Sequence, residues 1–467
     1  MKKLYFLLIF SVFFVKVNAQ PGVWTCIKPN TGIGNFGILG IPDSANTPPP
    51  LINPTSWTDL QGNFWIFGGV NSYFFPVQSW GDLWKYESAN NMWTWIKGSG
   101  TLGDPGVLGT MGVVDSISRP SSNTSKDAWI DINGDFWLFN GKMWKYNITS
   151  NTWTWMSGGG NVSWGTKGIS SPNNTPGARQ HFTAWTDSQG NFWLFGGRLA
   201  SDSFNDLWMY SIITNEWTWI NGTNTPEHTG SYGILGQPDS TNLPSSRRSP
   251  TSWIDHNERF WLFGGVQSGQ GNSTYCNLNY NDMWMFDPIT HIWTWMGGSS
   301  SINSNGNYES TCLSSSIYTP SARYGAQGNW TDNNGNLWLY GGGYVDGYCY
   351  GMKRHNDLWT FNPMTQEWSL KDGNFNTNQM HLINNVGVPS LANQPGARLG
   401  SVGWKNNSGE FYLFGGGIWN ELWKYSINPN GCDTNYNISG KIYFDSNNNC
   451  AYDNNESKLR NVKVLVY

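Results

Sequence analysis

The chain has 467 residues, a formal net charge of −4 at pH 7 and 12% charged residues. It also contains 56 glycines and 30 tryptophans. A weakly acidic chain without a basic run is poorly suited to bind nucleic acid. After the N-terminus, no apolar stretch is long enough to span a bilayer. This composition indicates a turn-rich all-β protein that is packed with aromatic side chains.

The first 19 residues have the pattern of a secretory signal peptide. Lys2 and Lys3 form a basic start, residues 4–15 are apolar, and residues 17–19 fit a cleavage site of small residues. Cleavage there would leave Gln20 as the first residue, and because this is not a cysteine, a lipid-anchored lipoprotein is disfavoured. We therefore expect an extracellular protein, either secreted or held at the cell surface.

A six-residue phrase recurs six times along the chain, and each copy is followed by a second signature that ends in Trp. In its fullest form the pair reads Phe-Trp-Leu-Phe-Gly-Gly and then Asp-Leu-Trp. Repeats of this length indicate a solenoid, a propeller or an array. The first phrase begins at Phe64, Phe136, Phe192, Phe260, Leu337 and Phe411, and the second at Asp82, Lys142, Asp206, Asp282, Asp357 and Glu421.

Each repeat contains four short strand patterns. In the third repeat, residues 183–186, 192–195, 207–210 and 217–220 are rich in aromatic and β-branched residues, and a Gly/Asn/Asp turn fills 187–191. No window has a sustained period of 3.6 residues, so we expect almost no helix. Four strands in each of six repeats predict an all-β fold with a six-bladed β-propeller.

The last repeat lacks its fourth strand, and the N-terminus supplies a match. Residues 23–28 repeat the pattern of residues 92–97 almost residue for residue, whereas the aromatic repeats stop at Tyr425. We expect the N-terminal strand to complete the last blade and to close the ring. Closure would remove an open sheet edge that otherwise favours aggregation.

A hydrophobic strand that ends in Gly-Gly and is followed by a spaced Trp resembles the Kelch repeat. The tandem array, from Trp24 to Tyr425, is similar to the Kelch-type propeller found in the central domain of galactose oxidase. The resemblance implies a propeller domain over residues 20–430. It implies little about activity, because one fold supports many functions.

The galactose oxidase copper site requires two tyrosines, two histidines and a cysteine cross-linked to one tyrosine. The histidines of this chain form no recognisable ligand pair, and His256 and His291 lie in or beside short turns. No Ser/His/Asp arrangement or phosphate-binding loop is recognisable either. The sequence leaves catalysis open and favours a propeller without an enzymatic activity or a cofactor. The six histidines are His181, His228, His256, His291, His355 and His381.

The order of the strands places long loops on one face of the propeller. These are the loops between the second and third strands, such as 70–80, 266–280 and 344–355, and the stretches between blades, such as 97–126. Long loops on a rigid scaffold often carry binding sites. We expect a binding or adhesion module for a protein or a glycan. The alternatives are a carbohydrate-active enzyme with its site at the channel mouth, and loops that merely cover that mouth.

An arginine recurs just before the first strand of four repeats, and two interpretations are open. A ring of arginines at the channel mouth would bind an anionic sugar or a carboxylate through forked hydrogen bonds. Alternatively, each arginine pairs with an acidic residue of the repeat and ties the blades together. The arginines are Arg179, Arg247, Arg323 and Arg398, and the acidic residues are Asp206, Asp282, Asp357 and Glu421.

Six cysteines in an extracellular protein are candidates for disulfides. Cys276, Cys312 and Cys349 lie in long loops. A bond between Cys26 and Cys432 would join the two ends of the propeller, and the alternative pairs Cys432 with Cys450. The sequence does not decide between these two connectivities.

The residues after the propeller, 431–467, change in character. Strand-like residues 438–444 and 462–466 flank a loop whose oxygen-bearing side chains match the spacing of a twelve-residue calcium loop. Cys450 replaces the usual glycine, and a polar loop without metal is the alternative. The segment resembles the calcium-binding B-repeat domains of bacterial adhesins, but two strands bury no core, so we expect a truncated β-sandwich that belongs to a longer secreted chain. The expected calcium ligands are Asp445, Asn447, Asn449, Ala451 through its carbonyl, Asp453 and Glu456.

Overall fold

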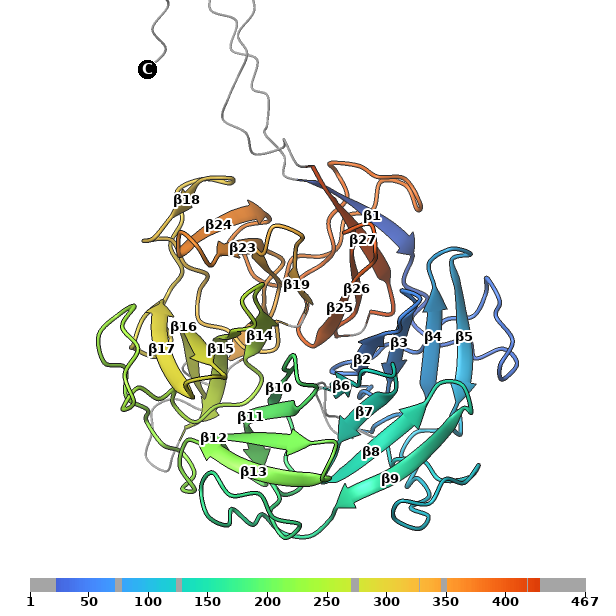
Figure 1. Ribbon diagram of the computed structural model, residues 1–467. Coiled ribbons are helices and arrows are strands. Elements are labelled where there is room, and N and C mark those ends of the chain that lie inside the picture. The colour runs from blue at the N-terminus through green and yellow to red at the C-terminus, as the bar shows by residue number, and fades with distance from the viewer. Residues whose placement is uncertain are drawn as a thin grey trace, which may run out of the picture.

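The computed structural model describes residues 22–71, 78–122, 128–269, 277–326, 328–345, 351–417 and 419–428. These residues form a six-bladed all-β propeller without helices, as the repeats predict (Figure 1). The expected signal peptide (1–19) and the expected C-terminal domain (431–467), with its calcium loop, lie outside the described residues. Both therefore stay predictions.

The first four blades are four-stranded antiparallel meanders. In chain order their strands are β2 (Thr55–Thr58), β3 (Phe64–Phe67), β4 (Leu83–Glu87) and β5 (Met92–Lys97) in blade A; β6 (Ala128–Ile130), β7 (Phe136–Phe139), β8 (Lys142–Asn147) and β9 (Thr152–Gly158) in blade B; β10 (Thr183–Thr186), β11 (Phe192–Leu199), β12 (Asp202–Ser211) and β13 (Glu216–Asn221) in blade C; and β14 (Thr251–Ile254), β15 (Phe260–Ser268), β16 (Asn277–Asp287) and β17 (Ile292–Gly297) in blade D.

Blade E has an added outer strand, and blade F takes its outer strand from the N-terminus. Blade E contains β19 (Gly328–Thr331), β20 (Leu337–Tyr340), β23 (Leu358–Asn362) and β24 (Glu367–Asp372), with β18 (Ser314–Ser315) beyond β24, and its loop between β20 and β23 forms the small hairpin β21 (Gly343–Val345) and β22 (Met352–Arg354). Blade F contains β25 (Ser401–Lys405), β26 (Phe411–Gly415), β27 (Leu422–Ile427) and β1 (Gly22–Lys28).

The pairing of β1 with β27 confirms the predicted closure of the ring. The two strands are antiparallel, with Trp24 opposite Tyr425. Trp24 is 1% exposed and packs edge-on against Trp423 and Tyr340, which belongs to the neighbouring blade E. The first and last described strands of the chain therefore lie side by side in one sheet (Figure 1).

Turns rich in Asp and Asn link the first two strands of the blades, and the Asp carboxylate of each turn bonds to the strand that follows. In blade C, Asp187 Oδ1 accepts hydrogen bonds from the backbone N–H groups of Gln189 and Asn191, and Asp187 Oδ2 accepts one from the Trp193 indole. The carboxylate thus fixes both the turn and the aromatic strand that follows it. Blades A, B, D and E repeat this arrangement with Asp59, Asp131, Asp255 and Asp332.

Neighbouring blades pack through aromatic side chains of their inner strands. Trp57 of blade A stacks on Phe136 of blade B at a centroid distance of 4.9 Å, and its indole donates a hydrogen bond to the carbonyl of Trp129. The same stacking recurs between Trp185 and Phe260. These large buried rings supply most of the hydrophobic contact between blades, as aromatic side chains do in other cores.

The stretches between blades, which we expected to be long loops on one face of the propeller, run along the outer edges of the sheets. The segment before each blade runs along the outermost strand of that blade and bonds to it. In blade B, for example, Gly112 N–H donates to Trp155 O, and in blade D, Gly236 N–H donates to Trp295 O. In blade E this contact is regular enough to form β18. An exposed sheet edge templates aggregation, so these long stretches protect the fold.

Cys26 is a free thiol, so the bond between Cys26 and Cys432, one of the two connectivities that the sequence leaves open, is absent from this structure. The side chain is fully buried in the core between blades E and F, among Trp330, Leu358 and Trp423. Burial raises the pKa of the thiol to about 12. The remaining alternative, Cys432 with Cys450, lies outside the described residues.

Candidate functional site

The face that carries the loops between the second and third strands is built unevenly. In blades C and D these strands extend past the sheet as hairpins, β11 with β12 and β15 with β16, and blade E adds β21 with β22. In blade B, Asn140 and Gly141 make a tight turn instead. Blades C, D and E therefore raise three hairpins on one side of this face, which we call the long-loop face.

The four recurrent arginines are buried and paired with the acidic residues. Arg247 donates to both carboxylate oxygens of Asp282, at 2.6 and 2.8 Å, and to the carbonyl of Gly264 at 2.8 Å. Arg179 and Arg323 make the equivalent bonds to Asp206 and Asp357. Arg398 donates to the carbonyl of Gly415 and to one carboxylate oxygen of Glu421. All four arginines are at most 1% exposed. An anionic ligand on this face would therefore contact other side chains.

The backbone of the same arginines joins neighbouring blades, as the second interpretation expected. Arg247 N–H donates to Phe204 O of blade C, and Arg247 O accepts from Gly197 N–H. Arg323 and Arg398 bond in the same way to the blades before them. This contact explains the first glycine of the Gly-Gly signature. A Cβ on Gly196 would lie 2.7 Å from Arg247 O, and the φ of Gly196 is +64°.

Blade A breaks this pattern. Leu51 stands at the position of the recurrent arginine, so no guanidinium among the described residues bonds to the buried Asp82. Asp82 Oδ1 accepts bonds from Trp95 and Gly100, whereas Oδ2 has no hydrogen-bond partner. Burial raises the pKa of Asp82 to about 6, against the opposing effect of those bonds.

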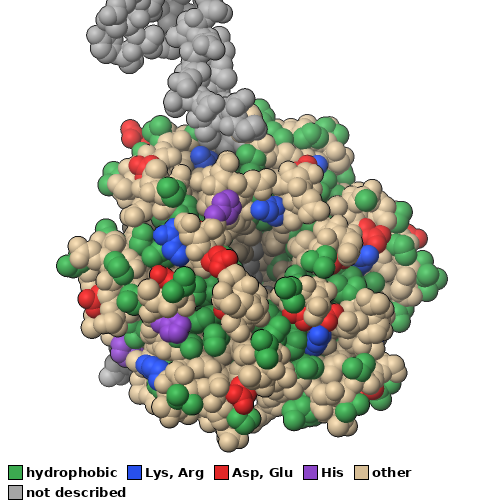
Figure 2. All heavy atoms as spheres, in the orientation of Figure 1, with side chains coloured by type: hydrophobic (Ala, Val, Ile, Leu, Met, Phe, Trp, Pro, Cys, Tyr) green, Lys and Arg blue, Asp and Glu red, His purple; other side chains and the backbone are tan. Residues whose placement is uncertain are grey.

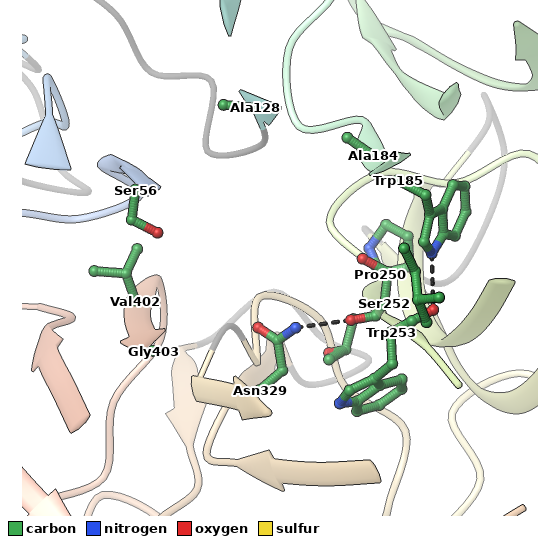
Figure 3. A pocket seen from close by; sticks show the side chains of 12 residues that line it. Ser56, Ala128, Ala184, Trp185, Pro250, Ser252, Trp253, Asn329, Val402 and Gly403 are labelled. Carbon is green, nitrogen blue, oxygen red and sulfur yellow. Dashed lines mark hydrogen bonds between the residues drawn. The ribbon is translucent and has the colours of Figure 1, made fainter. Parts of the chain in front are cut away.

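The central channel is narrow and neutral. The innermost strands of all six blades line a space of about 270 Å³, and each contributes at least one small, uncharged residue (Figure 3). Figure 3 shows Asn329 donating to the carbonyl of Ser252 across neighbouring blades, at 2.7 Å. A Cβ on Gly403 would lie 2.9 Å from the Trp330 indole. The six residues are Ser56, Ala128, Ala184, Ser252, Asn329 and Gly403.

A pocket of about 300 Å³ opens between blades D and E on the long-loop face. Asn279 at the start of β16 and Asn303 in the following stretch form one wall, and Tyr344 of β21, His355 and Phe375 form the other. We call it the D–E pocket. Three polar atoms of its lining residues are buried and have no hydrogen-bond partner: Asn279 Oδ1, Asn303 Nδ2 and His355 Nδ1. Such atoms are costly to bury, which makes a pocket that holds them a candidate for ligand binding.

His355 occupies a position where other blades have a larger aromatic ring. The residue two places before the acidic position is Trp80, Phe204, Tyr280 and Trp419 in blades A, C, D and F. The guanidinium of Arg247 lies 4.3 Å above the Tyr280 ring. His355 instead sits beside Arg323, and burial, reinforced by that charge, lowers the pKa of its imidazole to about 3. The imidazole is therefore uncharged at neutral pH.

Small side chains create the D–E pocket. Backbone bonds place Ser304 at the position of His228 in the preceding stretch and of Gln379 in the following one. Between blades C and D, His228 and Tyr280 take the places that Ser304 and His355 take between D and E. Sequence reasoning missed this site, because it shows only when positions from different segments are compared. The sequence signal for the pocket is His355, which stands where the equivalent position of other repeats has a larger aromatic residue.

A wider hollow of about 920 Å³ lies between blades E and F, toward the short-turn face. It is lined by polar residues such as Asp332, Ser369 and Glu410. Lys371 faces it at a position where blades A and C have Ile96 and Ile220. It also borders Asn428, which follows β27.

Charge and metal-ligand chemistry are sparse in the described part of the chain. Figure 2 shows charged side chains scattered singly or in small groups among neutral ones on the face it presents. The described residues contain no group of three or more His, Cys, Asp or Glu side chains that could hold a metal ion. They also contain no helix that could cross a membrane.

No family model matches the chain. A Rho GTPase-activating protein of Dictyostelium discoideum, gacHH, is 27% identical to it over 130 residues. That similarity covers 28% of this chain and 7% of the length of gacHH. The chain thus corresponds to a small part of this curated relative, and the similarity is local.

Proposed function

We propose that this protein is a binding or adhesion module that presents the long-loop face of its propeller to a protein or a glycan. The observation that carries the proposal is the D–E pocket. It is concave, it lies between the raised hairpins of blades D and E, and three buried polar atoms of its lining residues lack hydrogen-bond partners. A pocket with a few convergent polar groups is the usual form of a ligand site.

No observation on the described residues favours the carbohydrate-active enzyme. Glycoside hydrolysis requires a pair of carboxyl groups at the site. The residues that line the channel include no titratable side chain, and those of the D–E pocket include no carboxylate. The enzyme alternative would need groups from outside these two sites.

The repeats and the flanking segments extend the proposal. The Gly-Gly strands and spaced tryptophans support a propeller of the Kelch type, similar to the central domain of galactose oxidase. The segment 1–19 supports export of the protein, and export supports disulfides among the cysteines other than Cys26. The loop 445–456 supports calcium binding in a B-repeat-like domain.

Sequencing the N-terminus of the exported protein should give Gln20.

A pair of matched variants tests the face. The purified protein is applied to an array of glycans and of extracellular-matrix proteins. Asn305→Arg adds a long charged side chain at the rim of the D–E pocket, and Ile289→Arg adds the same side chain to the short turn between β16 and β17, where Ile289 is 90% exposed. We expect Asn305→Arg to abolish binding and Ile289→Arg to leave it unchanged. Absence of any binding, or loss through Ile289→Arg alone, would overturn the proposal.

A further inference from the structure

We propose that the D–E pocket binds one uncharged pyranose ring of a glycan, with hydroxyl groups bonded to Asn279, Asn303 and His355 and an apolar ring face against Tyr344 and Phe375. This inference rests on the proposed binding function and specifies its ligand class. It is based on the hydrogen-bond donors, the acceptors and the aromatic rings of the residues that line the pocket.

Asn279 and Asn303 line the pocket, and each keeps one polar side-chain atom without a hydrogen-bond partner. Asn303 Oδ1 accepts from both the backbone N–H and the side-chain amide of Asn279, at 3.0 and 2.8 Å. These bonds fix the orientation of both amides. They leave Asn279 Oδ1 as a free acceptor and Asn303 Nδ2 as a free donor. A pair of neighbouring sugar hydroxyls, each of which both donates and accepts, would satisfy the two atoms together.

His355 adds a second donor. Arg323 Nη2 donates to Ser321 Oγ at 3.1 Å, and the same oxygen lies 3.3 Å from His355 Nε2. Because the guanidinium can only donate, the Ser321 hydroxyl is free to donate its own proton to Nε2. With Ser321 as the donor, the proton of the neutral imidazole resides on Nδ1, which has no hydrogen-bond partner among the described residues. The side chain is 2% exposed, so this N–H is held in place to bond a ligand oxygen.

Two aromatic rings supply apolar surface in the pocket. The Tyr344 ring lies 5.6 Å from the His355 ring, and the Phe375 ring is held edge-on by Tyr308 at 4.3 Å. A pyranose has a face of C–H groups that loses contact with water when it lies on such rings. The combination of fixed polar atoms with aromatic surface therefore suits a sugar better than a purely apolar ligand.

The electrostatics of the pocket select against charged ligands. The lining side chains are uncharged, and the guanidinium of Arg323, which lies beside His355, is already bonded to Asp357. A carboxylate ligand would lose its hydration without gaining an opposite charge, which is unfavourable. The volume of about 300 Å³ is at the lower end for ligand pockets and fits one ring better than an oligosaccharide.

Saturation-transfer NMR on the intact protein tests this inference. The probes are the methyl glycosides of glucose, galactose, mannose, fucose and N-acetylglucosamine, together with methyl glucuronide as the charged counterpart. We expect at least one neutral glycoside to bind with a millimolar dissociation constant, as is usual for a single ring, and methyl glucuronide to bind at least tenfold more weakly. Failure of all neutral glycosides, or equal binding of the glucuronide, would overturn the inference.

Variants that copy neighbouring repeats locate the site. Ser304→His introduces the larger side chain that stands at the equivalent position between blades C and D, and we expect at least a tenfold loss of glycoside binding. Ser301→His, on the same stretch but exposed, is the control. His355→Phe copies Phe204 and removes the Nδ1 donor, and it serves if Ser304→His does not fold. Unchanged binding in His355→Phe and Ser304→His would exclude the D–E pocket.

The outcomes separate this inference from the broader proposal. If the array experiment gives a ligand that Asn305→Arg releases while no neutral glycoside binds, the pyranose inference is wrong and the binding function stands. If neither experiment gives a ligand, both are wrong.

Discussion

The indole N–H of Trp24 donates a 3.0 Å hydrogen bond to Asp372 Oδ2, although 348 positions separate the two residues in the sequence. Trp24 lies in β1, which completes blade F, whereas Asp372 ends β24 of blade E. The N-terminal strand is therefore fixed by the ladder with β27 on one side and by the neighbouring blade on the other.

Deletion of residues 20–28 should open the ring. It removes the ladder with β27 and the buried Trp24, whose burial alone is worth about 2–3 kcal/mol, and it exposes the edge of β27. We expect a lower melting temperature and self-association in size-exclusion chromatography. Trp24→Phe is the mild control, because it keeps a ring and loses one hydrogen bond, worth about 1 kcal/mol. A monomeric deletion variant with an unchanged melting temperature would disprove closure.

Cys26 should report on the same closure. Its thiol is fully buried and its pKa is raised to about 12, so the reactive thiolate is scarce at pH 8. We expect no alkylation by iodoacetamide in the native protein and complete alkylation after denaturation, read by mass spectrometry of the peptide that contains Cys26. Rapid modification of the native protein would show that β1 detaches readily.

The sequence predicts some of these relationships and not others, for physical reasons. The closing strand is predictable because Trp24 stands in the same local pattern as Trp93. The cover on the sheet edges is not, because it uses backbone groups, as in the bond from Gly112 to Trp155. The D–E pocket is not predictable either. The pocket exists because the side chains of Ser304 and His355 are smaller than those at the equivalent positions. No sequence motif marks such a space.

The buried arginine–carboxylate pairs should contribute more to the free energy of unfolding than exposed ion pairs do. Arg247→Met leaves the Asp282 carboxylate buried without its partner, and breaking such a pair costs about 3–5 kcal/mol. Arg259→Met removes a partly exposed pair with Asp255, worth up to about 1 kcal/mol. Urea unfolding of both variants checks this ranking. Equal free energies of unfolding for the two variants would mean that the pair of Arg247 with Asp282 contributes nothing beyond packing.

The expected calcium loop is tested by thermal unfolding of the protein with and without millimolar calcium. Asp445 and Glu456 carry charge at the first and last loop positions, so we expect millimolar calcium to raise the melting temperature of the C-terminal domain and to leave the propeller unchanged. Glu456→Gln should remove most of that shift, whereas Asn455→Gln should keep it. Calorimetry without calcium-dependent heat would leave a polar hairpin.

Asp82 should make blade A less stable at neutral pH than at mildly acidic pH. Its pKa is about 6 in the folded protein against an ordinary value of 3.8, so the folded state binds the proton more tightly than the unfolded state. For a carboxyl group whose pKa is raised by folding, the penalty is absent below the unfolded pKa and complete above the folded pKa. A difference of about two pKa units corresponds to about 3 kcal/mol at pH 7.5, of which roughly half is relieved at pH 5.

Asp82→Asn isolates this effect, because the other carboxyl groups contribute equally to the protein and to the variant. We expect the variant to be more stable than the unsubstituted protein at pH 7.5 and the difference to shrink at pH 5. Asp206→Asn is the matched control: it removes the partner of Arg179 and should destabilise the protein by about 3–5 kcal/mol at both pH values. If Asp82→Asn destabilises the protein at pH 7.5 as much as Asp206→Asn does, then Asp82 has a cationic partner that the described residues do not supply.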